Sequence, residues 1–181
     1  MQRFPSIVVR AFWTMLPAYV PNNAAVLAGG GRPIDGGRTR DGTRLLGDGK
    51  TWRGATVGTA YGVALALVLN ALGRPIGAAT GVSLPRFGRA ALTLPLGAIA
   101  GDIAASLYKR RSGRERGAPV VGLDQLDFVF GALSLTACVA PGWFRRVFRA
   151  PVLVVVLVLT PLLHVGSNLL AYLTGLKNEP Y

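Results

Sequence analysis

One set of side chains near the middle of the chain has the types and spacing of a site that handles phosphate. The separations are i, i+4, i+7 and i+8, and the residues are Asp102, Ser106, Lys109 and Arg110. At 3.6 residues per turn these side chains share one helix face, with Asp102 about 10 Å from Lys109 along the axis. A carboxylate inside an apolar segment is costly and usually faces a polar cavity with a partner. The spacing therefore predicts a cavity reached by Asp102, and a structural ion pair with an arginine of a neighbouring helix is the alternative.

A second pair of carboxylates, Asp124 and Asp127, is spaced i, i+3 and also lies on one helix face. Two ionised carboxylates in this arrangement repel each other unless a cation pairs with them. Magnesium binds in proteins through a few carboxylates together with substrate phosphates and water. The pair therefore predicts a divalent-metal site. A helix N-terminus that benefits from the helix dipole is the alternative.

The stretch 32–53, RPIDGGRTRDGTRLLGDGKTWR, concentrates charge and glycine between two apolar segments. Glycine allows backbone N–H groups to approach a ligand closely, and lysine and arginine suit phosphate. Aspartate suits magnesium or a ribose hydroxyl. The stretch therefore predicts a membrane-surface pocket for a metal-bound nucleotide, and a solvated basic loop that touches anionic headgroups is the alternative. Its charged residues are Arg32, Arg38, Arg40, Arg44, Lys50 and Arg53, together with Asp35, Asp41 and Asp48.

The elements that must position these residues are long apolar segments. The chain of 181 residues has a mean hydropathy of +0.42 and only 15% charged residues, which is too apolar for an ordinary soluble domain. A bilayer core of about 30 Å requires about 20 helical residues. We therefore predict an all-α, polytopic membrane protein with five transmembrane helices and a polar cavity at its cytoplasmic face. The five segments are 11–31, 54–73, 90–108, 128–144 (beginning near Leu123) and 150–176.

Two of these segments carry residues that are uncommon inside an apolar helix. Pro17 and Pro21 interrupt the first segment and predict a bend. The bend either changes only the direction of the helix or also opens the wall of a cavity. On the last segment His164, Asn168 and Tyr172 are spaced i, i+4, i+8. This polar stripe predicts either contacts that join helices or a cavity wall.

The distribution of cations predicts the orientation, because cytoplasmic loops carry an excess of lysine and arginine. One side of the predicted topology carries twelve cations, from the 32–53 loop, the 109–117 loop and the tail, and the other side carries eight. We therefore place the protein in the cell membrane as a multi-pass protein, with the N-terminus outside and the C-terminus and site cytoplasmic. The net charge of +12 could indicate nucleic acid as a partner. We expect no nucleic-acid partner, because the cations interrupt apolar runs and no RNA- or DNA-binding motif is present.

Four strings of residues are distinctive, namely GRPIDGGRTRDGTRLLGDGKTWRG, GDIAASLYKRR, GLDQLDFVFGAL and HVGSNLLAYLTGLKNEPY. Together they resemble the archaeal CDP-archaeol synthase family, whose members are CTP:2,3-di-O-geranylgeranylglycerol-1-phosphate cytidylyltransferases. A more distant resemblance is to the CDP-diacylglycerol synthases, through their Ser-x-x-Lys-Arg segment and final aspartate pair. The chain departs from the bacterial signature at 115–116 and 121–123. The resemblance implies that residues 1–181 form a single membrane-embedded cytidylyltransferase domain.

The resemblance also implies partners and roles. The partners are CTP, an isoprenoid glycerol-phosphate lipid and membrane lipids, and the cofactor is Mg²⁺, held by Asp124 and Asp127 with Asp102. These three aspartates and Lys109 are the implied catalytic residues. The implied CTP-binding residues are Asp35, Asp48, Gly49, Lys50, Thr51, Arg53, Ser106, Lys109 and Arg110.

Two other functions fit part of this sequence pattern. A CDP-alcohol phosphatidyltransferase is also a membrane helix bundle with paired aspartates, but its Asp-Gly-x-x-Ala-Arg motif is missing, since Phe128 and Val129 follow Asp127. An anion transporter or channel is the alternative from another class, and the lack of a detectable inverted repeat disfavours it.

Overall fold

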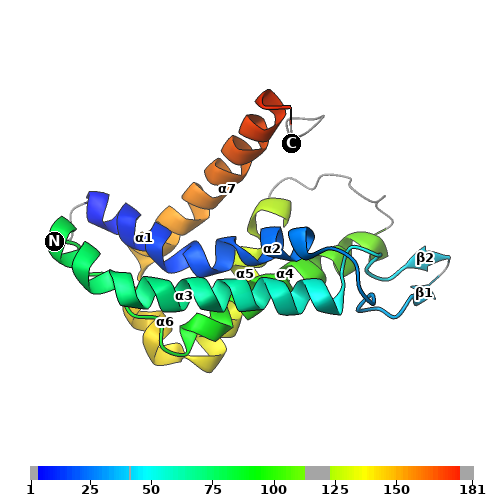
Figure 1. Ribbon diagram of the computed structural model, residues 1–181, viewed down its shortest axis with the longest axis horizontal. Coiled ribbons are helices and arrows are strands. Elements are labelled where there is room, and N and C mark those ends of the chain that lie inside the picture. The colour runs from blue at the N-terminus through cyan, green and yellow to red at the C-terminus, as the bar shows by residue number, and fades with distance from the viewer. Residues whose placement is uncertain (1–3, 41, 113–122, 176–181) are drawn as a thin grey trace.

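The computed structural model describes residues 4–40, 42–112 and 123–175. Within these ranges the chain forms seven helices and one short antiparallel pair of strands (Figure 1). The helices are α1 (Phe4–Tyr19), α2 (Pro21–Ala28), α3 (Trp52–Thr80), α4 (Ala90–Arg111), α5 (Leu123–Val139), α6 (Pro141–Val147) and α7 (Ala150–Leu173). The strands are β1 (Thr39–Arg40) and β2 (Thr43–Arg44), and both belong to the loop between α2 and α3.

The helix bundle has two ends, which we name by their residues. The site end holds the start of α3 at Trp52 and the α2–α3 loop, and the far end holds Phe87 and the α6 helix. Figure 1 shows β1 and β2 at one end of the molecule and the N-terminal start of α1 at the other, while α7 projects obliquely from the remaining helices.

Three helices are long and apolar enough to cross a membrane, namely α3, α4 and the Ala150–Leu170 part of α7. They correspond to the predicted segments 54–73, 90–108 and 150–176. The helices in the other two predicted segments, α1 and α5, have 16 and 17 residues, fewer than the about 20 that a bilayer core requires. The all-helical membrane fold is therefore confirmed, and the count of five transmembrane helices stays a prediction.

Prolines divide two of the predicted segments. The bend expected in 11–31 is a break at Val20, after which Pro21 opens α2, because proline has no N–H to continue the helix of α1. Segment 128–144 is divided at Pro141. Its helix ends at Val139, and Ala140 (φ −131°, ψ 55°) precedes Pro141, which starts the separate helix α6.

Glycines let the helices approach one another closely. A Cβ at Gly58 of α3 would lie 2.4 Å from the carbonyl oxygen of Pro21, and one at Gly62 would lie 2.7 Å from that of Pro17. Between α4 and α5, a Cβ at Gly131 would lie 2.2 Å from the carbonyl oxygen of Gly97. These backbone contacts are typical of helices packed within a membrane, where small residues permit close approach. They place the bend between α1 and α2 directly against α3.

We predict that Gly58→Ala lowers the free energy of unfolding by about 1–3 kcal/mol, because the added methyl group cannot fit without moving backbone. Gly73→Ala on the same helix is the control. A Cβ there would lie 3.5 Å from the Trp13 ring, which is ordinary contact, and alanine is the better helix former by about 1 kcal/mol. Thermal unfolding of both variants in detergent tests this. Equal unfolding temperatures for the two variants would contradict it.

Candidate active site

The α2–α3 loop closes on itself just before α3. The Ile34 N–H donates to the Lys50 carbonyl at 2.8 Å, and the Trp52 N–H donates to the Arg32 carbonyl at 3.1 Å. The Thr51 hydroxyl accepts from the Gly54 N–H at 3.0 Å and caps the first turn of α3. Lys50 is thus held between a backbone pairing and a helix N-terminus, so its position is defined by the chain on both sides.

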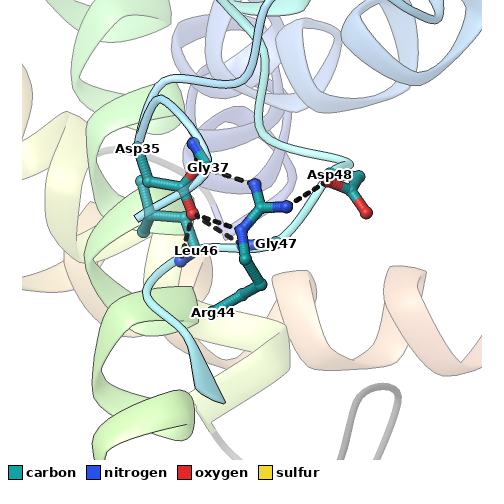
Figure 2. A network of polar contacts seen from close by, with 6 residues as sticks. All are labelled: Asp35, Gly37, Arg44, Leu46, Gly47 and Asp48. Carbon is teal, nitrogen blue, oxygen red and sulfur yellow. Dashed lines mark hydrogen bonds and ion pairs between the residues drawn. The ribbon is translucent and has the colours of Figure 1, made fainter. Parts of the chain in front are cut away.

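Asp35 organises the interior of this loop (Figure 2). Its carboxylate accepts from the Arg44 guanidinium at 2.8 and 3.3 Å and from the backbone N–H groups of Gly37, Leu46 and Gly47 at 3.0, 3.0 and 3.3 Å. Arg44 also donates to Asp48 at 2.6 Å. The Asp35 side chain is 1% exposed and that of Asp48 is 69% exposed. Asp35 therefore joins residues 35–37 to residues 44–47 of the loop, and Asp48 holds Arg44 from the outside.

The same contacts set the charge of Asp35. The hydrogen bonds from Arg44 lower the pKa of the Asp35 carboxyl well below its usual range, and the three backbone donors lower it further, against the opposing effect of burial. A depressed aspartate pKa stabilises the folded state fully above the ordinary value, and this contribution is lost only as the pH falls through the depressed value. The loop network is therefore intact throughout the neutral range.

Lys50 reaches from the loop to α4, where its ammonium forms an ion pair with Asp102. The two residues line a cavity of about 170 Å³ together with Gly49, Thr51 and Asn22. The first turn of α3 also borders this cavity, through Gly54 and Ala55, and it carries no acidic residue. An unopposed helix N-terminus beside a lysine is a favourable environment for an anion.

A larger cavity of about 490 Å³ adjoins the first and shares Asn22, Asn23 and Asp102 with it. It lies between α1, α2, α4, α5 and α7. Its polar and charged lining residues are Tyr19, Asn22, Asn23, Asp102, Lys109, Asp124, Asp127, Thr160, His164, Ser167 and Asn168. Three carboxylates and a lysine from the two helices α4 and α5 therefore meet in one cavity.

The charged groups of the larger cavity differ in their partners. The Lys109 ammonium donates to Asp124 at 2.5 Å. Asp127 accepts from the Phe128 N–H at 2.5 Å and makes no ion pair with any residue that the structure describes. Across the cavity, the hydroxyl groups of Tyr19 and Thr160 lie 2.9 Å apart and connect α1 to α7. Among the three carboxylates of this cavity, Asp127 is thus the one with no ion pair to a described residue.

The remaining predicted site residues lie elsewhere. Asp35 borders a separate hollow of about 430 Å³ on the α2–α3 loop. Arg110 lies beside the loop, with a guanidinium nitrogen 3.7 Å from where a Cβ of Gly47 would be. Three predicted site residues line neither of the two adjoining cavities, namely Asp48, Arg53 and Ser106. Arg53 is exposed.

Sequence reasoning did not select Asn22, Tyr19 or Thr160 for the site. Asn22 lines both cavities, and its buried side-chain oxygen has no hydrogen-bond donor among the described residues. Its place directly after Pro21 was the available signal, because a break in a membrane helix needs polar groups nearby. His164 and Asn168 of the polar stripe line the cavity, whereas Tyr172 does not.

The acidic groups do not form a complete metal site by themselves. Among residues 4–40, 42–112 and 123–175, no group of three or more His, Cys, Asp or Glu side chains is placed to hold a metal ion. Asp124 and Asp127 still lie one turn apart on α5 and line the same cavity. This donor set fits a hard cation that takes the rest of its oxygen ligands from a bound phosphate and water.

An apolar groove of about 490 Å³ continues from the larger cavity toward the far end. It shares Phe12 and Leu16 with the cavity. Its other lining residues are Val8, Val9, Trp13 and Leu159. A charged cavity that continues into an apolar groove suits a ligand with a polar head and a hydrocarbon tail.

Comparisons with known proteins identify the family of the chain. The model of the CarS-like CDP-archaeol synthase family matches residues 4–181. The CDP-archaeol synthase of Halorubrum lacusprofundi is 64% identical over 177 residues, which are 97% of this chain and 98% of that protein. The CDP-archaeol synthase of Methanococcoides burtonii is 46% identical over 175 residues, covering 92% of this chain and 100% of that protein.

The fold of this chain is also similar to that of a solved structure. It is described as an intramembrane enzyme for archaeal membrane lipids biosynthesis, and it is 37% identical to this chain, with a TM-score of 0.71 over 89% of this chain and 94% of the other. The family model, the relatives and the solved structure each cover most of the sequence, and all of them indicate an enzyme of archaeal lipid synthesis. The chain belongs to the CDP-archaeol synthase family.

Proposed function

We propose that this protein transfers CMP from CTP to 2,3-bis-O-(geranylgeranyl)-sn-glycerol 1-phosphate, giving CDP-2,3-bis-O-(geranylgeranyl)-sn-glycerol and pyrophosphate. Membership of the CDP-archaeol synthase family supports this reaction. The observation that carries it is the meeting of Asp102, Lys109, Asp124 and Asp127 in one cavity beside Lys50. Carboxylates and lysines in this arrangement suit a metal-bound triphosphate and a second phosphate.

In the proposed reaction an oxygen of the lipid phosphate attacks the α-phosphorus of CTP. The new oxygen–phosphorus bond forms as the bond from the α-phosphorus to the oxygen bridging to the β-phosphorus breaks, and pyrophosphate leaves with that electron pair. A phosphate monoester is largely ionised near neutral pH, so no side chain needs to remove a proton. The protein then lowers the barrier by aligning the reactants and neutralising charge.

The smaller cavity is suited to the triphosphate. Lys50 and the backbone of Gly49 and Thr51 face it, next to the N-terminus of α3. The N–H groups of a helix start and a lysine both favour phosphate oxygens. Lys50 would therefore bind the phosphates of CTP, and Lys109 would bind a phosphate in the larger cavity.

Asp124 and Asp127, with Asp102 nearby, would hold the proposed Mg²⁺. When bound, this ion neutralises phosphate charge and stabilises the departing pyrophosphate. In the structure Lys50 pairs with Asp102 and Lys109 pairs with Asp124. A metal-bound triphosphate brings both a cation for the carboxylates and an anion for the lysines. Binding would therefore exchange partners without leaving a buried charge uncompensated.

The larger cavity and the apolar groove would share the lipid substrate. The phosphate would lie near Lys109, and a prenyl chain would follow the groove past Leu16 toward Val8. The groove offers apolar side chains along α1 and contains no charged lining residue. A tail in this groove would keep the headgroup in the cavity by burying hydrocarbon.

The proposed topology has five transmembrane helices, an outside N-terminus, and a cytoplasmic active site and C-terminus. The α1 helix begins at the far end and reaches the cavity at Tyr19, while α7 begins at Ala150 and reaches the cavity at His164 and Asn168. Since the described chain starts at one end and finishes toward the other, an odd number of crossings fits. A cavity that opens to the cytoplasm would give cytoplasmic CTP direct access to the active site.

The reaction itself is tested by the fate of the phosphorus atoms of CTP. Label at the α-phosphorus should enter the lipid product, and label at the β- or γ-phosphorus should appear in pyrophosphate. The assay uses purified protein in detergent with the lipid phosphate and each of the four ribonucleoside triphosphates. Transfer of γ-label to the lipid would indicate a kinase, and no nucleotide-dependent labelling would refute the proposal.

We predict that Asp127→Asn lowers turnover by about two orders of magnitude, because it removes a charge proposed to hold the metal in the transition state. Ser134→Ala, on an exposed position of the same helix, is the control and should keep normal turnover. The measurement is the initial rate at saturating CTP and lipid phosphate, with the unfolding temperature recorded for each variant. A near-normal rate for folded Asp127→Asn would rule out the metal assignment.

Lys50→Ala should raise the dissociation constant for CTP about tenfold or more, since a hydrogen bond to a charged group is worth about 1.5–3 kcal/mol. Arg74→Ala removes the same charge from an exposed position at the far end and should leave the affinity unchanged. Equilibrium binding of CTP in the presence of Mg²⁺ measures both. Equal affinity of the Lys50→Ala protein and the wild type would place Lys50 outside the CTP site.

A further inference from the structure

The far end of the bundle carries many cations and no acidic residue among those the structure describes. The described acidic residues, Asp35, Asp48, Asp102, Asp124 and Asp127, all belong to the loop or to the lining of the cavity at the site end. The described far-end cations are Arg10, Arg74, Arg86, Arg89, Arg145, Arg146 and Arg149. Arg74 lies 22 residues after Trp52 on α3, or about 33 Å along the axis, which is close to the thickness of a bilayer core. These arginines therefore lie at the level of the second headgroup layer.

Three of these arginines lie where α1, α6 and α7 meet, and we call them the junction arginines. The Arg10 guanidinium donates to the Arg146 carbonyl at 3.3 Å, and Arg149 directly precedes α7. α7 carries no acidic residue in its first turn and has no side-chain cap. The junction therefore combines three positive charges with the positive end of a helix, and no acidic residue among those that the structure describes pairs with them.

Two donors on this part of α1 have no acceptor among the described residues. They are the Arg10 Nε–H and the Trp13 indole N–H, and both nitrogens are buried. Arg10 and Trp13 are one turn apart, and the Trp13 side chain is only 7% exposed. A buried donor without an acceptor costs free energy. An oxyanion beside α1 would remove this cost and would also balance the charge.

The surroundings of the junction arginines identify the kind of anion. Val9 and Phe12 flank Arg10 on α1, and each is 42% exposed. The aromatic cluster of Phe87, Trp143, Phe144 and Phe148 lies at the same end, and the Trp143 indole donates to the Arg86 carbonyl at 2.6 Å. Tryptophan with a polar partner is typical of the membrane–water interface. The anion must therefore lie where headgroups meet hydrocarbon.

We propose that Arg10, Arg146 and Arg149 bind the phosphate of an anionic phospholipid from the leaflet opposite to the active site. The lipid phosphate accepts from the arginine side chains and the unpartnered donors of α1, while its hydrocarbon covers the exposed apolar residues beside Arg10. Arginine suits this role because its planar donors match phosphate oxygens. None of the three arginines lines the two catalytic cavities, so binding of the headgroup does not depend on the proposed reaction. Val9 and Phe12 also line the groove proposed for the prenyl chain.

The test measures the unfolding temperature of the full chain in nanodiscs of phosphatidylcholine alone and of phosphatidylcholine with phosphatidylglycerol. For the wild type we expect the anionic lipid to raise it by about 5 °C. The triple variant Arg10→Gln, Arg146→Gln, Arg149→Gln should lose most of this rise. A second triple variant is the matched control, with Arg74→Gln, Arg86→Gln and Arg89→Gln. It removes three exposed charges from the same end and should keep the full rise in unfolding temperature.

Two further measurements make the outcome decisive. If the triple variant does not fold, the single variant Arg149→Gln, at an exposed position, replaces it. Native mass spectrometry then counts the phosphatidylglycerol molecules that the protein retains. Arg149→Gln should retain fewer of them than Arg74→Gln. Inorganic phosphate added to phosphatidylcholine nanodiscs should not reproduce the rise. An equal loss in both triple variants, equal lipid retention in the single variants, or a full effect of inorganic phosphate would overturn the proposal.

Discussion

The ion pair between Lys50 and Asp102 is the contact on which the candidate site depends. It joins a loop outside the bundle to a carboxylate on α4, 52 residues away in the sequence. A charged aspartate among apolar helices is costly unless a cation accompanies it, and Lys50 supplies that cation. The same contact holds the α2–α3 loop against the smaller cavity. Loop position and charge balance inside the bundle are therefore coupled through one pair of side chains.

Aspartates of identical chemistry have different roles because their surroundings differ. Asp35 is nearly inaccessible and satisfied by five donor contacts within its loop, so its charge is used to fold that loop. Asp102 and Asp124 each pair with a lysine beside open space, and Asp127 makes no ion pair with a described residue. Charges paired in this way can exchange partners when a ligand brings both signs of charge. The loop network is thus structural, and the cavity carboxylates are suited to chemistry.

Close approach of backbones gives the cavity its position. Pro21 breaks the first helical segment, and Gly58 and Gly62 of α3 leave room for the carbonyl oxygens at the break. Asn22 follows the break and lines both cavities. A larger residue at either glycine would move α1 and α2 away from α3, because a Cβ there would collide with backbone rather than with a flexible side chain. Helix packing and site geometry therefore have a common origin in small residues and one proline.

The sequence by itself determined the apolar segments, the proline break and the helix faces shared by Asp102 with Lys109 and by Asp124 with Asp127, because these depend only on local periodicity and backbone chemistry. It also carried the resemblance to the family, since motif strings are local. Only the tertiary structure decided that Lys50 pairs with Asp102, that the hydrogen bonds of Asp35 are all made within the loop, and that Arg53 and Ser106 lie outside the cavities. Those outcomes depend on how a glycine-rich loop folds back and on how helices pack, and both are set by contacts between residues far apart in the chain.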